Sequence, residues 1–270
     1  MINGEKSVTD TIIKYPRTPH IEGSRLGEGD FDLERIAFSA LAGEILTLEE
    51  KVDGANTAVS FGADGELLLQ SRGHYMRGGG REEQFSLFKI WASTHRASLY
   101  SMLGKRYIMY GEWLYAKHAV YYDALPHYFM EFDIFDKETG RFLDTEKRRS
   151  ILSGSPVVSV PMLKQAKFAS LKELTALITE SPYISEKYLE SFDKECISLG
   201  LDPISERALL PDSRLMEGIY IKIEAEGEVK DRMKFVRKGF RQIQLASDNT
   251  GYKPIIKNSL SPSAKDIFAL

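Results

Sequence analysis

The sequence predicts an α+β protein in which antiparallel sheets are flanked by helices. Alternating apolar segments bounded by turn residues occur in both halves of the chain, as expected of half-buried antiparallel strands. Between them, apolar residues with helical spacing mark a helical insertion at about residues 167–201. No low-complexity tract or fixed-period repeat interrupts the 270 residues. We therefore expect a single domain over residues 1–270.

The strands of the first half follow from turn dipeptides. Residues 43–61 are predicted to form two strands joined by a tight turn at "VDGAN", because Asp-Gly favours hairpin turns between alternating segments. The turn "GADG" then leads into a third strand, "ELLLQSR". Residues 82–103 have near-helical spacing of aromatic and apolar residues and predict packed helices.

Three later segments complete the β-structure. "RYIMYGEWLY" and "HYFMEFDIFD" are aromatic, strand-like stretches that each contain acidic residues. Residues 217–237 predict a hairpin around the turn "AEGE". Since burial of an unpaired carboxylate is costly, the acids within these strands require partners or a function.

Composition excludes some classes of protein. The chain has 36 Lys and Arg against 39 Asp and Glu, so it lacks the strongly basic charge typical of many nucleic-acid-binding domains, although a local basic groove remains compatible with it. No apolar run approaches the roughly 20 residues that span a bilayer, and the N-terminus has no signal-peptide pattern. The single cysteine cannot form an internal disulfide. We expect a cytoplasmic protein with no membrane partner.

Lys51, in "LEEKVDGANTAVSF", is a candidate nucleophile at the end of a predicted strand. A lysine amine has an ordinary pKa of about 10.4 and attacks only after losing its proton. Nearby cations would lower that pKa if the 43–61 and 217–237 segments face each other across a cleft. A single K-x-D-G tetrapeptide does not distinguish a nucleophile from a surface lysine.

Six segments in order strengthen this interpretation: "EKVDGAN", "SRG", "YGEWLY", "FMEFDIFD", "EGIYIKIE" and "KFVRK". Their order and chemistry resemble the covalent nucleotidyltransferase superfamily, and most closely the ATP-dependent RNA ligases, in particular an RNA ligase 2-like adenylyltransferase domain of a bacterial or phage branch. The resemblance covers about residues 44–240. It implies a nucleotidyltransferase fold that is ATP-grasp-like, with antiparallel sheets flanked by helices. "KYPRTPHIEGSR" and "GEWLYAKHAVYYDALPHYF" extend the similarity.

The resemblance assigns the reacting groups. It implies that Lys51 attacks the α-phosphate of ATP, that Asp53 and Gly54 shape the turn behind it, and that Glu217 assists a divalent metal. Two further lysines are implied to contact the α-phosphate: Lys222 and Lys234. Charge neutralisation and in-line positioning are what phosphoryl-type transfer requires, so this set is chemically coherent.

The resemblance also assigns the groups that hold the nucleotide. Glu50 is implied to read adenine, and Phe129, which we favour over Phe132, to stack on it. Asn56 lies where RNA ligases place an asparagine needed for sealing. Arg72 is implied to contact ribose or phosphate, and Glu112 the ribose hydroxyls.

Two features depart from the family pattern. Glu217 and Lys222 are five positions apart, so in a regular strand they point to opposite faces, and their shared site is inferred from the family alone. A second lysine common in the family, two residues after the position of Lys234, is replaced by Val236. Arg237 or Lys238 are the candidates to replace it at the phosphates, although arginine is no simple substitute for lysine.

The leading hypothesis is an ATP-dependent RNA ligase that uses Mg²⁺ or Mn²⁺ and joins RNA 3′-OH and 5′-phosphate ends through a lysyl-AMP intermediate. The ends could belong to a nicked duplex, a broken tRNA loop or free strands. One alternative is a DNA ligase or mRNA guanylyltransferase of the same superfamily. Those enzymes usually carry an oligonucleotide-binding-fold domain, which we do not expect in the roughly 30 residues after "KFVRK".

The other alternative is a non-catalytic RNA-binding or nucleotide-sensing module, acting beside a separate end-healing kinase or phosphatase. Retention of Lys51, Glu112, Glu217 and Lys234 argues against it.

Overall fold

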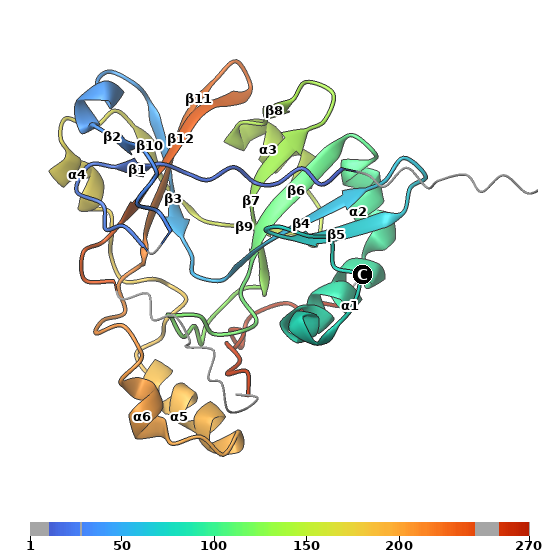
Figure 1. Ribbon diagram of the computed structural model, residues 1–270, viewed down its shortest axis with the longest axis vertical. Helices are drawn as coiled ribbons and strands as arrows, with labels where there is room; N and C mark the ends of the chain where they lie inside the picture. Colours follow the sequence, from blue (N-terminus) through green and yellow to red (C-terminus); the bar gives the residue numbers. More distant parts are fainter. Residues whose placement is uncertain (1–10, 28, 241–253, 270) are drawn as a thin grey trace, which may run out of the picture.

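The computed structural model describes residues 11–27, 29–240 and 254–269. Its strands form two sheets that stand side by side in Figure 1. Sheet A has the strand order β10 (Met162–Ala166), β3 (Leu46–Lys51), β11 (Gly218–Ala225), β12 (Glu228–Val236), β1 (His20–Ile21) and β2 (Arg35–Ile36). Sheet B has the order β5 (Leu67–Ser71), β4 (Ala55–Phe61), β6 (Tyr107–Trp113), β7 (Phe129–Asp136) and β8 (Arg141–Phe142), with β9 (Val158–Ser159) also paired to β7.

The pairing within both sheets is mainly antiparallel. Parallel pairs occur where β1 joins β12 and β2, and where β9 joins β7. The predicted α+β class with antiparallel sheets and flanking helices is confirmed.

Helices flank the two sheets, and the two labelled α5 and α6 lie below the sheets in the view (Figure 1). They are η1 (Phe38–Leu41), η2 (Gly80–Phe85), α1 (Ser86–Thr94), α2 (Arg96–Leu103), α3 (Thr145–Leu152), α4 (Leu171–Thr175), α5 (Tyr188–Ser198) and α6 (Pro203–Arg207). The helices predicted for 82–103 are present, and α1 packs Phe88 and Trp91 against sheet B. The insertion predicted for 167–201 is also helical and continues through α6 to Arg207. Among the described residues, no helix is both long and apolar enough to cross a membrane.

The hairpin predicted for 217–237 is confirmed as β11 and β12. Its turn places Glu226 and Gly227 at φ of 57° and 81°. Two successive residues with positive φ are typical of the turn that suits the right-handed twist of a hairpin.

The hairpin predicted for residues 43–61 is wrong in one respect. Both strands exist, but β3 lies in sheet A and β4 in sheet B. The reason is that both edges of β3 are already taken, one by β10 and the other by β11, while β4 pairs with β5 and β6. Residues 52–54 therefore carry the chain from one sheet to the other, and Lys51 lies at that junction.

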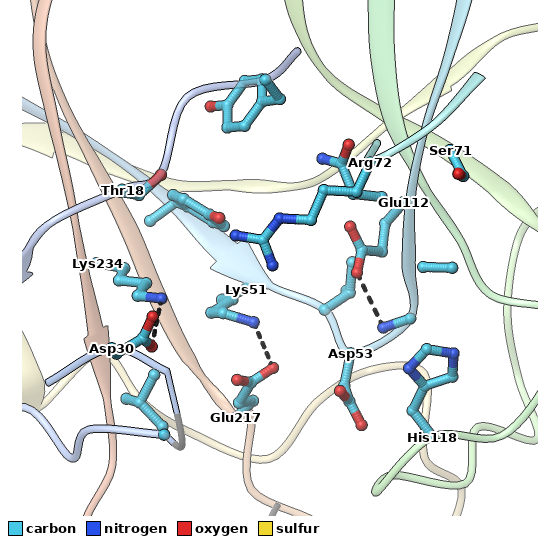
Figure 2. A pocket seen from close by; sticks show the side chains of 18 of the residues that line it. Thr18, Asp30, Lys51, Asp53, Ser71, Arg72, Glu112, His118, Glu217 and Lys234 are labelled. Atoms are coloured by element: carbon cyan, nitrogen blue, oxygen red, sulfur yellow. Dashed lines mark hydrogen bonds and ion pairs between the residues drawn. The ribbon is translucent and has the colours of Figure 1, made fainter. Parts of the chain in front are cut away.

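Alternation along the strands of sheet A separates an apolar outer face from a polar inner face. Leu48 and Ile221 are fully buried in the outer cluster with Leu174 of α4. On the inner face, Lys51 ends β3 and Lys234 lies on β12, both directed toward the space between the sheets (Figure 2). The polar face thus looks toward sheet B.

Further along this same inner face, buried ion pairs join the two sheets. Lys222 Nζ lies 2.7 Å from Glu49 Oε2 and 3.1 Å from Asp133 Oδ1. Arg148 of α3 lies 2.5 Å from Glu49 Oε1 and 3.2 Å from Glu131 Oε1. These pairs account for Glu131 and Asp133 within "HYFMEFDIFD", and its third acid, Asp136, pairs with Arg106 at 2.6 Å, so each buried carboxylate has a cationic partner.

Candidate functional site

A cavity of about 530 Å³ opens between the ends of the two sheets (Figure 2). Sheet A contributes Lys51 and Lys234, and sheet B contributes Asn56 and Glu112. Of the residues expected at the nucleotide, the structure places eight in its lining: Lys51, Asp53, Gly54, Asn56, Arg72, Glu112, Glu217 and Lys234.

Lys51 ends β3, and its Nζ donates a hydrogen bond to Glu217 Oε2 over 2.7 Å. Both side chains are largely buried, at 16% and 6% exposure. Burial alone would lower the pKa of Lys51, but the adjacent Glu217 carboxylate outweighs it and holds the pKa above its ordinary value. In this state the amine is a protonated, positioned cation.

Gly54 allows the close approach of the 52–54 crossing to the end of β6. Its N–H donates to Glu112 Oε1 over 3.0 Å. A Cβ at this position would lie 2.6 Å from the backbone oxygen of Trp113, so only glycine fits. Burial raises the pKa of the Glu112 carboxyl to about 7.

Asp53 also holds the segment that follows β6. Its Oδ2 accepts hydrogen bonds from the backbone N–H groups of Ala119 and Val120, at 2.7 and 2.9 Å. The Tyr122 hydroxyl in turn accepts from the Asp53 N–H at 2.9 Å. These bonds fix the segment after β6 that brings His118 to the cavity, next to Asp53 in Figure 2.

Two polar groups in the cavity lack protein partners among the described residues. Asn56 Oδ1 is buried without a hydrogen bond. The guanidinium of Arg72 has no ion-pair partner in the described part of the chain, and it extends over Lys51 and Glu112 in Figure 2. Buried polar atoms are normally satisfied, so an orphaned amide beside an unpaired guanidinium suits a ligand with polar and anionic groups.

Four residues expected at the nucleotide lie outside this cavity. Glu50 is on the opposite face of β3 because strand side chains alternate, and its Oε1 accepts from Ser181 Oγ at 2.6 Å. Phe129 is fully buried on the helix-covered side of sheet B, where its ring stacks on Trp91 with centroids 5.1 Å apart. Neither residue therefore lies where the adenine contact implied by the resemblance would place it.

The two basic residues also differ from expectation. The buried ion pairs behind the cavity hold Lys222, whose Nζ also donates to the backbone oxygen of Phe132 at 2.6 Å. Arg237 follows β12 and donates from Nε to the backbone oxygen of Met216 at 2.9 Å. At the position of the second family lysine, the side chain of Val236 lines the cavity instead.

Several lining residues were not assigned a role from the sequence. They are Tyr15, Thr18, His20, Arg25, Asp30, His118 and Tyr220. Most of them lie in "KYPRTPHIEGSR" and "GEWLYAKHAVYYDALPHYF", two segments that the sequence analysis found similar to the family. Neither segment matched a motif of known role, so no function could be assigned to these residues from the sequence.

A divalent ion at this site would need ligands beyond the described side chains. Among the described residues, no cluster of three or more His, Cys, Asp or Glu side chains could hold a metal. Mg²⁺ commonly binds through one or two carboxylates together with substrate phosphates and water. Glu217, as a carboxylate at the cavity floor, fits such shared coordination.

Comparison with known proteins gives a family. The model of the family described as RNA ligase matches residues 44–236. No curated protein matches the chain.

Similar solved structures include variants of an RNA ligase from Naegleria gruberi. One with ATP and Mn shares 16% identity at a TM-score of 0.47, covering 74% of this chain and 51% of that one. Another, with AMP and Mn, has 14% identity and a TM-score of 0.48, and again covers 74% of this chain and 51% of that one. A third structure, with PPi, shares 16% identity at 0.47, covering 73% and 51%. The chain thus spans about half the length of these proteins.

Proposed function

This chain belongs to the RNA ligase family, and from that premise we propose that it is an ATP-dependent RNA ligase with Lys51 as the nucleophile. One observation carries the proposal. Lys51 lies in a cavity that two carboxylates and two further cations also line. The carboxylates are Glu112 and Glu217, and the cations are Arg72 and Lys234. Such a set can bind a triphosphate, neutralise developing charge and hold a primary amine in line.

In the first step, the Lys51 ammonium gives up its proton to solvent, and the neutral amine attacks the α-phosphorus of ATP. A phosphorus–nitrogen bond forms, the bond from the α-phosphorus to the bridging oxygen breaks, and pyrophosphate leaves. Arg72 and Lys234 are positioned to neutralise phosphate charge, and a divalent ion bound with Glu217 would add Lewis-acid stabilisation. Glu112 and Asn56 are available to bind the ribose side of the nucleotide.

Two further transfers would complete ligation. A 5′-phosphate oxygen of RNA attacks the adenylate and releases Lys51, and an RNA 3′-hydroxyl then attacks the activated 5′-phosphorus and expels AMP. The same cavity would serve all three steps, since each needs a fixed phosphorus and a charged surround.

The first test is the covalent intermediate. Intact-mass spectrometry after incubation with ATP and Mg²⁺ is expected to find one added AMP, and peptide mapping to place it on Lys51. Lys51→Arg is expected to abolish it, because arginine keeps the charge beside Glu217 but stays protonated. Lys172→Ala, at an exposed position of α4, should retain it. A labelled Lys51→Arg variant would show that another residue is the nucleophile.

Substrate specificity needs a separate comparison. Labelling from ATP is expected to exceed labelling from GTP, and nicked RNA to be sealed in preference to nicked DNA. Preferential labelling by GTP would favour an mRNA guanylyltransferase, and preferential DNA sealing a DNA ligase. RNA binding without any adduct would favour a non-catalytic module.

A further inference from the structure

One side of the cavity is built by residues that precede the matched segment 44–236. Strand β1 pairs in parallel with β12 in a register that sets His20 beside Lys234. The N–H of Lys234 donates to the backbone oxygen of Pro19 over 2.9 Å, and that of Arg25 donates to Val236 over 2.9 Å. The backbone around Lys234 is therefore fixed by this upstream segment.

The same segment also holds the side chain of Lys234. Asp30 Oδ2 accepts from Lys234 Nζ at 2.9 Å and contacts His20 Nε2 at 3.0 Å (Figure 2 shows the Lys234–Asp30 pair). His20 Nδ1 lies 2.6 Å from Ser24 Oγ, which accepts from the Val236 N–H at 2.9 Å.

The hydrogen-bond network fixes the direction of each bond. Asp30 is ionised beside the Lys234 ammonium and can only accept, so His20 Nε2–H donates to it, and in the neutral ring Nδ1 then accepts from Ser24 Oγ. Burial lowers the pKa of His20, in keeping with this neutral ring. The chain of bonds runs unbroken from the backbone of β12 back to the ammonium of its own Lys234.

We propose that Asp30 is a positioning residue that acts through Lys234, holding its ammonium at the phosphate side of the cavity during lysine adenylation. The inference rests on the proposed function. It assigns a role to a residue upstream of the segment that carries the family resemblance.

The electrostatics of the cavity give this contact a purpose. Burial lowers the pKa of Lys234, Lys51 lowers it further, and Asp30 and Glu217 oppose them. The Lys234 and Asp30 side chains are 14% and 19% exposed, so the pair is poorly screened. Without Asp30, a second cation beside Lys51 would be both less stable and less well placed.

The neighbouring carboxylate offers a matched control. Asp32 lies on the same loop and pairs with Arg17 at 2.6 Å, but its side chain is 70% exposed and it does not line the cavity. Asp32→Asn therefore removes an equal charge from the loop without touching Lys234.

Two measurements test the inference, and the first does not depend on catalysis. The rate at which acetic anhydride acylates Lys234, read by peptide mass spectrometry at about pH 8, is expected to rise about tenfold in Asp30→Asn, because a lost ion pair raises the free-amine fraction. Asp32→Asn should leave it unchanged. Equal Lys234 reactivity in wild type and Asp30→Asn would overturn the inference, whether or not the protein forms an adduct.

The second measurement is a double-mutant cycle on the adenylation rate. At saturating ATP, Asp30→Asn is expected to slow adduct formation by about 10- to 100-fold, the size of a lost charge-assisted hydrogen bond. It should not weaken binding of a non-hydrolysable ATP analogue, because a negative charge near the phosphates is removed. In a Lys234→Gln background the same substitution should have no further effect.

The outcomes separate the possibilities. An equal Asp30→Asn effect with and without Lys234, or a loss of analogue affinity as large as the loss of rate, would indicate a collapsed loop and overturn the positioning role. A wild type that forms no adduct, combined with the expected change in Lys234 reactivity, removes the proposed function and leaves the Asp30–Lys234 contact supported.

Discussion

Lys51 donates a hydrogen bond to Glu217 over 2.7 Å across the floor of the cavity. Lys51 ends β3, and Glu217 immediately precedes β11, the neighbouring strand of sheet A, in which Gly218 is paired with Lys51. The contact holds the amine in place and keeps it protonated, so the group that positions the nucleophile also restrains its reactivity.

Removal of the Glu217 charge is expected to make Lys51 more reactive as an amine while abolishing adenylation. The carboxylate raises the pKa of Lys51, so Glu217→Gln should lower that pKa and increase the free amine at a given pH. Competitive acylation with acetic anhydride at about pH 8 is expected to label Lys51 at least about tenfold faster in the variant. AMP labelling should be lost because the variant lacks the carboxylate proposed to bind the divalent ion.

Acylation of Lys172 in the same samples provides the internal reference. If Lys51 reacted at the same rate in wild type and Glu217→Gln, the ion pair would not control its protonation.

Gly54→Ala is expected to destabilise the protein and to distort the cavity. The added methyl would approach the Trp113 oxygen to 2.6 Å, and overpacking of this kind typically costs about 1–3 kcal/mol. Urea denaturation should show the loss, and AMP labelling should fall with it. Gly73→Ala is the matched control, because its Cβ would meet nothing within 4 Å. Equal stability of the two variants would contradict the close approach.

Glu50→Gln is expected to stabilise the protein at alkaline pH and leave AMP labelling intact. Burial raises the pKa of Glu50 from 4.5 to about 7. A carboxyl with a raised pKa in the folded state favours folding below its unfolded pKa, and that contribution is lost as pH rises through about 7. Glutamine removes this dependence and keeps an acceptor for Ser181.

The free energies of unfolding of wild type and Glu50→Gln should therefore agree near about pH 4 and diverge by up to about 3 kcal/mol by about pH 8. Loss of ATP binding in this variant would instead support the adenine contact implied by the family resemblance.

Lys222→Gln is expected to act on stability rather than on nucleotide binding. The substitution removes the lysine that Glu49 and Asp133 both contact. Breaking such a buried ion pair lowers the free energy of unfolding by about 3–5 kcal/mol. The denaturation midpoint should fall strongly, whereas ATP affinity, measured calorimetrically on the folded variant, should stay near that of wild type. Lys172→Gln, at an exposed position of α4, should change neither. Weakened ATP binding by a fully folded Lys222→Gln would restore its expected phosphate contact.

Most of the secondary structure could be predicted because turn residues and side-chain periodicity are local. Asp-Gly and Glu-Gly dipeptides marked chain reversals, and helical spacing marked α1, α2 and the insertion. The crossing at residues 52–54 could not be recognised in this way. A tight hairpin and a passage between sheets share the same local pattern, and the difference lies in which strands occupy the edges of β3.

The site residues, too, could be predicted only in part from local sequence. The ordered motifs were enough to bring Lys51, Arg72, Glu112, Glu217 and Lys234 to attention, and the structure places all of them in one cavity. Motif matching was less informative for Glu50 and Phe129, since a motif gives sequence position while strand alternation decides the face. Asp30 lay outside any matched motif.

By itself, the sequence determined the fold class, the nucleophile candidate and the family, because these depend on short-range pattern and on the order of motifs along the chain. Only the tertiary structure decided which charges serve the cavity and which hold the sheets together. Lys222 and Lys234 look equivalent as strand lysines, but one lies between Glu49 and Asp133 while the other faces Asp30. Their environments come from residues far away in the sequence, and electrostatic interaction depends on distance in space.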